Sequence, residues 1–245
     1  DDELVIAGQG TIADELLRQN PGKLDAIFIP VGGGGLIAGM ALYMKTLRPE
    51  IQIIGVEPTD SDAMYQSLAQ GKPISLQSVG IFADGVAVRR VGYLTYELCQ
   101  KYVDRIIRVT TDELCGGIKA IYQSTRSIVE PAGGLGMAGL LKYIHETGCT
   151  GQTLVAVNSG ANMNFERLRY VAERTRIGEK QEALFAVAIP EKPGSLKSFC
   201  KDMVGKRNIT EFNYRFSSRK GAHIFVGIST RDEKERYSFR DQLTN

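Results

Sequence analysis

Four consecutive glycines stand between an apolar segment and a segment with helical spacing, and they are the strongest chemical signal in the sequence. Glycine lets a backbone approach a ligand closely and adopt positive φ angles. The N–H groups of such a loop, together with the first turn of a following helix, form a binding site for an anion. Four glycines are more than a tight turn needs, so we expect the loop to bind a phosphate group. The residues of the loop are Gly32, Gly33, Gly34, Gly35 and Leu36.

The same loop also matches a dinucleotide-binding fingerprint. Gly33, Gly35 and Ala38 have the G-x-G-x-x-A spacing of that motif. Glu57 ends the next predicted strand about 20 residues further on, where a carboxylate could bind a ribose hydroxyl. A single match of this kind is weak evidence, so an NAD-type dinucleotide-binding domain stays open as an alternative.

Three further loops carry side chains that could act beside a cofactor. Ser159 lies in Asn158-Ser-Gly-Ala-Asn162, after a predicted strand, and its hydroxyl could bond to a cofactor ring nitrogen. Glu130 opens a predicted helix in Glu130-Pro-Ala-Gly-Gly134, and the third loop is Ala83-Asp-Gly-Val86. Taken alone, each has an ordinary interpretation: a turn serine, a solvated carboxylate at a helix start, and a structural turn.

Strands and helices alternate along most of the chain, which is typical of an open parallel sheet covered by helices. We therefore predict an α/β fold built from strand–loop–helix–strand units. Strands are predicted at residues 24–30, 51–56, 105–109 and 153–157, and helices at 11–20, 36–47, 60–70, 93–102, from about 112, 134–146 and 165–176.

The pattern changes after a polar connector at residues 178–182. The order that follows, β-α-β-β-α, is that of a ferredoxin-like fold without its last strand. We place the domain boundary near residue 180, with domains at 1–178 and 182–245. Because the first pattern begins at once and the last predicted helix is cut short, we expect a fragment of a longer protein. The elements are a strand at 183–189, a helix at 195–203, strands at 209–216 and 223–229, and a charged helix from about residue 232.

The composition excludes several classes of function. The 245 residues are 43% hydrophobic and 24% charged, with a net charge of +2, as in ordinary globular proteins. We expect no nucleic-acid partner, because no cluster of basic residues with interleaved aromatics is present, and no membrane partner, because no apolar run could span a bilayer. The two histidines exclude a His-rich metal site, and the four well-separated cysteines are predicted to be free thiols.

Together these segments resemble the fold-type-II pyridoxal-phosphate family, and within it the biosynthetic threonine dehydratases (threonine ammonia-lyases). The resemblance covers nearly the whole chain in family order. The glycine and serine loops are shared with relatives such as serine racemase, whereas the run at 210–216 is narrower and favours the two-domain biosynthetic branch over the catabolic one. The matching stretches are Ile6-Ala-Gly-Gln-Gly-Thr11, the tetraglycine loop, Gly55-Val-Glu-Pro58, Phe82-Ala-Asp-Gly-Val-Ala-Val88, Glu130-Pro-Ala-Gly133, Ser159-Gly-Ala-Asn162, Glu182-Ala-Leu-Phe-Ala186 and Thr210-Glu-Phe-Asn-Tyr-Arg-Phe216.

The resemblance implies a tryptophan-synthase-β-like catalytic domain that binds pyridoxal 5'-phosphate. Gly32 to Leu36 would hold its phosphate, and Ser159 would face the pyridine nitrogen with Gly160 beside it. Glu130, the one catalytic candidate in this chain, would lie beside the cofactor and help to set its protonation or hold the pocket. The implied reaction removes the Cα proton and the β-hydroxyl of L-threonine, giving 2-oxobutanoate and ammonia in isoleucine biosynthesis. L-Serine would be a poorer substrate, because a pocket rejects a smaller analogue only weakly. A neutral serine need not keep the ring protonated, which favours prompt β-elimination.

One part of the family pattern has no counterpart in this sequence. The family's Schiff-base lysine lies in a Ser-Phe-Lys-x-Arg-Gly-Ala motif upstream of the tetraglycine loop, and no such motif occurs here. Lys23, Lys45 and Lys72 stand in other contexts, so we expect the chain alone to be inactive. Some relatives bind a divalent metal near the Ala-Asp-Gly loop with the help of a glutamate; residues 78–81 contain none, so we predict no metal.

The segment from residue 183 resembles an ACT-like domain. In the family such domains bind isoleucine, and often valine, and regulate the catalytic domain, which requires different effector affinities in two states. The family also implies a homo-oligomer, in the form of a tetramer. A non-catalytic amino-acid sensor stays open as a second alternative. We expect the protein in the cytoplasm or, if it comes from a plant or alga, in the plastid.

Overall fold

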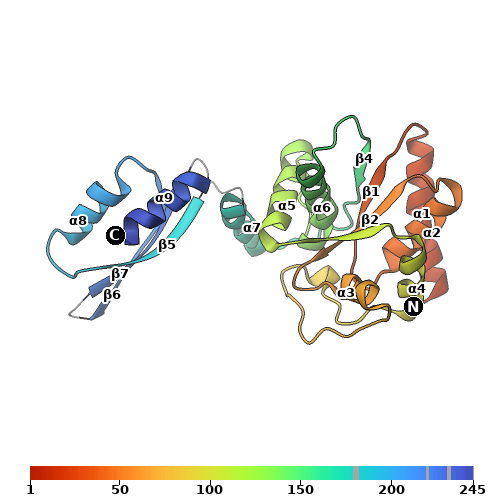
Figure 1. The fold of residues 1–245 in the computed structure, drawn as a ribbon, viewed down its shortest axis with the longest axis horizontal. Coiled ribbons are helices and arrows are strands. Elements are labelled where there is room, and N and C mark those ends of the chain that lie inside the picture. The colour runs from red at the N-terminus through yellow and green to blue at the C-terminus, as the bar shows by residue number, and fades with distance from the viewer. Residues whose placement is uncertain (179–181, 219–220, 231–232, 245) are drawn as a thin grey trace. The chain divides into compact units, whose positions relative to one another are not determined.

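A parallel β-sheet and an antiparallel β-sheet form the centres of two separate compact units in the computed structural model, Asp1–Ala172 and Glu173–Asn245 (Figure 1). The structure describes residues 1–178, 182–218, 221–230 and 233–244. The division between the units falls inside one helix, α7 (Phe165–Gly178). The domain boundary predicted between residues 178 and 182 stays a prediction, since residues 179–181 lie outside the described residues.

The sheet of the first unit has four parallel strands in the order β3-β2-β1-β4, which confirms the predicted open parallel sheet. Ala26 of β1 pairs with Gln52 of β2 and with Leu154 of β4. Every residue of β1 is buried, as expected for a central strand with helices on both faces. The strands are β1 (Ala26–Pro30), β2 (Gln52–Pro58), β3 (Arg105–Val109) and β4 (Leu154–Ala156).

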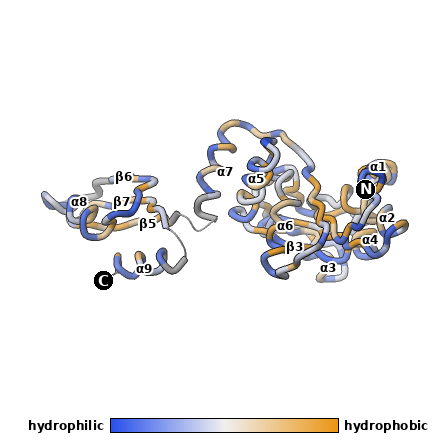
Figure 2. Tube along the Cα trace, turned by 90° about the horizontal axis from the view of Figure 1, so that it is seen from above, coloured by the Kyte–Doolittle hydropathy of each residue, from blue (hydrophilic) through white to orange (hydrophobic). Residues whose placement is uncertain are grey.

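Helices cover both faces of this sheet and bury the alternating side chains of its strands. Ile27 and Ile29 pack in one hydrophobic cluster with α1, α2 and α4, whereas Phe28 packs in a second cluster with α5 and α6. Hydrophobic segments lie inside the first unit, and α7 carries many hydrophilic residues (Figure 2). The remaining elements of the unit are α1 (Glu3–Gln19), α2 (Gly35–Leu47), α3 (Ala63–Gln70), η1 (Asp84–Val86), α4 (Tyr93–Tyr102), α5 (Thr111–Thr125) and α6 (Pro131–Thr147).

Helix α1 begins at Glu3, so the predicted start at residue 11 was wrong. The Asp2 carboxylate caps the helix by accepting hydrogen bonds from the N–H groups of Leu4 and Val5. Glycines in this segment disfavour a helix by intrinsic propensity, but tertiary packing reverses the effect. An ideal Cβ on Gly39 of α2 would lie 2.1 Å from the carbonyl oxygen of Ile6, so α1 and α2 touch through their backbones.

The second unit contains an antiparallel sheet of order β5-β7-β6 and confirms the predicted β-α-β-β-α order within the described residues. The helix predicted at 195–203 is a short α-helical turn that continues as a π-helix. Phe185 and Phe239 meet edge to face at 5.0 Å in the core of the unit. No helix in the described ranges is both long and apolar enough to cross a membrane. The elements are β5 (Glu182–Ile189), α8 (Ser195–Ser198), the π-helix η2 (Phe199–Val204), β6 (Ile209–Ser218), β7 (Gly221–Ser229) and α9 (Glu233–Thr244).

Candidate functional site

The tetraglycine loop lies where the sequence predicts it, between the carboxyl end of β1 and the first turn of α2. Gly34 is the N-cap of α2 and has a φ of 94°, a backbone conformation that residues other than glycine rarely adopt. An ideal Cβ on Gly34 would also lie 2.6 Å from Cε of Met64 and 3.0 Å from Cβ of Thr95. Gly34 is therefore required by the fold itself, whether or not a ligand binds.

Gly33 and Gly35 face open space instead. An ideal Cβ on either residue would meet no atom within 4 Å, and neither residue has a positive φ. Both line a cavity of about 430 Å³ that also contacts Arg90, Gly92 and Thr95. Within residues 1–178 as described, no acceptor is found for the N–H groups from Gly32 to Leu36. Unbonded N–H groups at a helix start suit an anion, and the charged residues that line the cavity are Arg90, Asp1 and Asp2.

One of the other predicted loops, Ala-Asp-Gly, contacts the tetraglycine loop directly. An ideal Cβ on Gly32 would lie 3.0 Å from Cα of Val86, and one on Gly85 would lie 2.9 Å from Cβ of Ala132. The Ala-Asp-Gly loop therefore fits between the tetraglycine loop and the start of α6. Strands β1 and β4 are adjacent and parallel, so the serine loop after β4 leaves the sheet at the same edge, where ligands bind in open α/β sheets.

Glu130 and Gly160 form the contact between the start of α6 and the serine loop. The N–H of Glu130 donates to the carbonyl oxygen of Gly160 at 3.1 Å. An ideal Cβ on Gly160 would lie 1.9 Å from Oε1 of Glu130, so the half-buried carboxylate lies against the backbone of this loop. Ser159, the next residue, is exposed. The structure thus brings Glu130, Ser159 and Gly160 together at the carboxyl edge of the sheet.

Asp84 of the Ala-Asp-Gly loop pairs with Arg167 of α7, a contact that the sequence did not reveal. The two guanidinium nitrogens lie 2.8 and 2.9 Å from the two carboxylate oxygens, a two-point geometry typical of strong ion pairs. The Arg167 guanidinium lowers the pKa of the Asp84 carboxyl below its usual value. The rings of Phe82 and Tyr170, whose centroids are 5.1 Å apart, pack together and hold the same loop to the same helix.

Glu57 does not have the role that the dinucleotide alternative assigned to it. Its side chain is fully buried, and its two oxygens accept hydrogen bonds from the N–H groups of Met64 and Tyr65, at 2.9 and 2.8 Å. Burial raises the pKa of Glu57 to about 8, although these two hydrogen bonds act in the opposite direction. The carboxylate caps α3 and is closed to a ribose hydroxyl, so the NAD-type alternative loses its best support.

Two of the lysines that lie outside a Schiff-base motif pair with carboxylates far from the loops. Lys23 precedes the amino end of β1 and lies 2.8 Å from Asp25, and Lys45 in the last turn of α2 lies 2.8 Å from Asp104. The tetraglycine loop stands at the opposite end of both elements.

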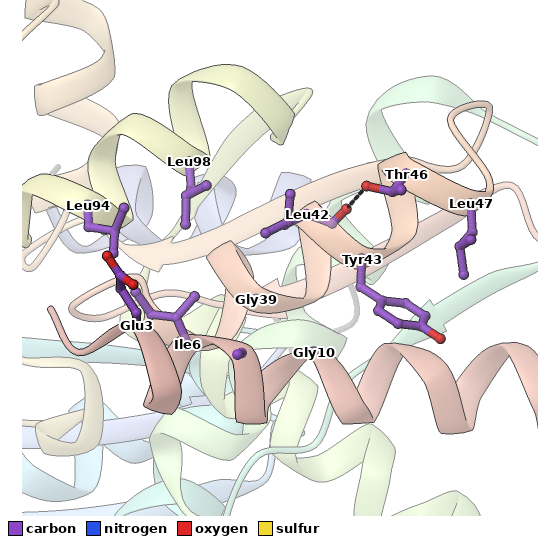
Figure 3. Close-up of a pocket in the computed structure, with 11 residues that line it drawn as sticks. Glu3, Ile6, Gly10, Gly39, Leu42, Tyr43, Thr46, Leu47, Leu94 and Leu98 are labelled. Atoms are coloured by element: carbon purple, nitrogen blue, oxygen red, sulfur yellow. Dashed lines mark hydrogen bonds between the residues drawn. The ribbon is translucent and has the colours of Figure 1, made fainter.

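A second cavity, of about 550 Å³, lies between α1, α2 and α4 and has a different character (Figure 3). Leu42, Leu94 and Leu98 contribute apolar side chains to it. The hydroxyl of Thr46 donates locally to the carbonyl oxygen of Leu42 at 2.7 Å. None of the predicted site residues lines this cavity.

Models of known protein families match both units of the chain. The family model for pyridoxal-phosphate dependent enzymes matches residues 1–160. The model for the C-terminal regulatory domain of threonine dehydratase matches residues 173–245. These matches confirm the cofactor class and the two-part fold that the sequence resemblance implied.

The individual relatives are named as biosynthetic threonine dehydratases, the group that the sequence resembles. The biosynthetic L-threonine dehydratase of Burkholderia multivorans is 57% identical over 96% of this chain and 46% of its own length. The Escherichia coli enzyme of that name is 48% identical, over 100% and 48% of the two lengths. The chloroplastic biosynthetic threonine dehydratase of Arabidopsis thaliana is 50% identical, over 94% and 39%. The chain thus spans about half the length of the curated relatives that it matches.

Solved structures give the same result for the fold. The processed form of threonine deaminase isoform 2 from Solanum lycopersicum superposes with a TM-score of 0.71 at 43% identity, covering 72% of this chain and 48% of that one. The structure of serine racemase from Dictyostelium discoideum superposes with a TM-score of 0.60 at 34% identity, covering 67% and 52%. The chain therefore belongs to the pyridoxal-phosphate dependent enzyme family, and its C-terminal part is the regulatory domain found in threonine dehydratase.

Proposed function

We propose that this chain provides the phosphate-binding loops and the regulatory domain of a lyase that deaminates L-threonine to 2-oxobutanoate and ammonia. The single observation that carries the proposal is the tetraglycine loop, whose N–H groups at the start of α2 have no acceptor among the described residues. The names of the relatives and the match to the threonine dehydratase regulatory domain support the choice of substrate.

The chain's residues fit the cofactor that the family uses. The N–H groups of Gly32 to Leu36 would hold the phosphate of pyridoxal 5'-phosphate, and the positive end of α2 would stabilise its negative charge. Gly33 and Gly35 leave room for the phosphate, because a side chain at either position would project into unfilled space. Once bound, the cofactor supplies an electron sink that stabilises the carbanion formed at Cα of the substrate.

The serine loop would orient the cofactor ring. The Ser159 hydroxyl would hydrogen-bond the pyridine nitrogen, and a neutral hydroxyl does not hold a proton on that nitrogen as a carboxylate would. Glu130 would act by holding Gly160, and with it Ser159, against the start of α6.

The finer parts of the proposal concern partners and compartment. Isoleucine and valine would bind to the regulatory unit as effectors, L-serine would be a secondary substrate, and the working protein would be a tetramer. We propose the cytoplasm as its location, with the plastid for a plant or algal source; relatives named as chloroplastic and mitochondrial also exist.

Calorimetric titration of the purified chain with pyridoxal 5'-phosphate tests the proposal. We expect binding that inorganic phosphate displaces, and much weaker binding of pyridoxal, which lacks the phosphate. We expect no 2-oxobutanoate from the chain and threonine, because no Schiff-base lysine motif is present. Equal affinity for pyridoxal and its phosphate would contradict the role of the loop, and turnover of threonine would contradict the expected inactivity.

A further inference from the structure

The hydroxyl of Thr95 is hydrogen-bonded to the tetraglycine loop. Thr95 lies in the first turn of α4 and is 3% exposed. Its Oγ1 lies 2.7 Å from the carbonyl oxygen of Gly33 and 3.2 Å from that of Gly92. A threonine hydroxyl has a single proton to donate, and the shorter distance favours Gly33. A buried side chain on another helix thus holds one specific carbonyl of the loop.

This bond determines where the next N–H group points. In a planar trans peptide, the C=O and the N–H point in opposite directions. With the Gly33 carbonyl directed at Thr95, the N–H of Gly34 is directed away from Thr95. Cβ of Thr95 and Cε of Met64 also pack against Gly34, so the peptide between Gly33 and Gly34 is held by a hydrogen bond and by contact.

Such a restraint matters because glycine flanks this peptide on both sides. A peptide between two glycines rotates more freely than any other, since no Cβ restricts φ or ψ. Rotation by half a turn would exchange the positions of the Gly34 N–H and the Gly33 carbonyl oxygen. An anion in the loop would then lose a donor and meet the negative end of a carbonyl dipole.

We propose that Thr95 is a positioning residue for the anion-binding loop, and that its hydroxyl keeps the Gly33–Gly34 peptide oriented for a phosphate group. The inference rests on the proposed function of the tetraglycine loop. Thr95 acts through the loop and does not itself need to touch the phosphate. The sequence does not suggest this role, because Thr95 is 62 residues away from Gly33.

Two variants of Thr95 separate the hydroxyl from the size of the side chain. Thr95→Val keeps the shape and removes the donor, whereas Thr95→Ser keeps the donor and removes a methyl group. In calorimetric titration of the 245-residue chain, we expect Thr95→Val to weaken pyridoxal 5'-phosphate binding about tenfold, the effect of one typical hydrogen bond. Thr95→Ser should stay within about twofold of the parent chain. Inorganic phosphate should follow the same order, and the weak binding of pyridoxal should not change.

A ligand-free measurement makes the inference independent of cofactor binding. In ¹⁵N NMR spectra of the unliganded chain, Thr95→Val should shift or broaden the amide signals of Gly33 and Gly34, and Thr95→Ser should leave them in place. Unchanged signals and unchanged affinity in Thr95→Val would overturn the positioning role. If the parent chain binds neither phosphate nor the cofactor, the proposed function of the loop fails, while the NMR comparison still decides whether Thr95 orients the peptide.

Discussion

Adjacent glycines of the tetraglycine loop should respond in opposite ways to the same substitution. In Gly34→Ala, the alanine backbone must adopt a φ of 94°, and the new Cβ approaches Met64 and Thr95. A non-glycine residue in a sparsely populated conformation costs about 1–3 kcal/mol, and we expect a loss of stability in that range. In Gly33→Ala, φ is ordinary and the Cβ meets no atom within 4 Å. Stability should change by less than about 1 kcal/mol, with an increase favoured because alanine restricts the unfolded chain.

For Gly33→Ala, affinity should fall although stability does not. The methyl group of Gly33→Ala would occupy space that the phosphate needs, so this stable variant should lose affinity for pyridoxal 5'-phosphate by at least about tenfold, which corresponds to 1.4 kcal/mol. Urea unfolding followed by circular dichroism gives the stability of each variant, and calorimetric titration gives its affinity.

Gly71→Ala is the matched control for backbone strain. Gly71 has a φ of 70° and open space around it, and it ends α3 outside the loop. Its substitution should cost about 1 kcal/mol for a left-handed alanine and leave binding unchanged. The reasoning is refuted if Gly33→Ala binds the cofactor as tightly as the parent chain, because the open space beside Gly33 would then not be the phosphate site.

Three further predictions follow from individual contacts. The pKa of Glu57 is raised to about 8 from an ordinary value of 4.5, so between these pH values the folded chain keeps a proton that the unfolded chain has lost, and the free energy of unfolding should decline as pH rises from about 4.5 to 8. In urea unfolding measured over this pH range, Glu57→Gln should remove the decline. An identical decline in both chains would exclude Glu57 as its source. Arg167→Gln removes the ion pair that holds Asp84 to α7 and lowers its pKa, so amide hydrogen exchange of residues 84–88 should become faster. The control Arg18→Gln breaks an exposed pair with Asp14 and should leave the exchange of these amides unchanged. Unchanged exchange in Arg167→Gln would show that the Asp84–Arg167 pair does not hold the loop. Ile224→Ala truncates a fully buried side chain of the second unit and should cost that unit about 2–5 kcal/mol, with cofactor affinity unchanged; a parallel loss of affinity would show that the loops depend on the second unit.

The amino-acid sequence by itself determined the elements that depend on local signals. The run from β1 through the glycines to α2 is recognisable because buried parallel strands are continuously apolar and because four glycines have few other uses. The start of α5 is also local: Thr110 and Glu113 form the reciprocal capping pair that their spacing indicates. The serine loop could be placed at the carboxyl edge of the sheet because it follows a strand, whereas the Glu130 loop joins two helices and its place could not be predicted in this way.

Only the tertiary structure decided the contacts between segments distant in the chain. Helix α1 begins at Glu3, where Asp2 caps it, and its glycine-containing first half stays helical because Gly39 lets its backbone pack on α2, a contact that the sequence does not show. Glu57 looks like a ribose ligand in the sequence, and burial under α3 makes it a helix cap. Arg167 is 83 residues from Asp84, and hydrogen bonds at such separations follow from how the helices pack on the sheet. Chemical groups can therefore be identified from the sequence, whereas their partners, and thus their roles, depend on the fold.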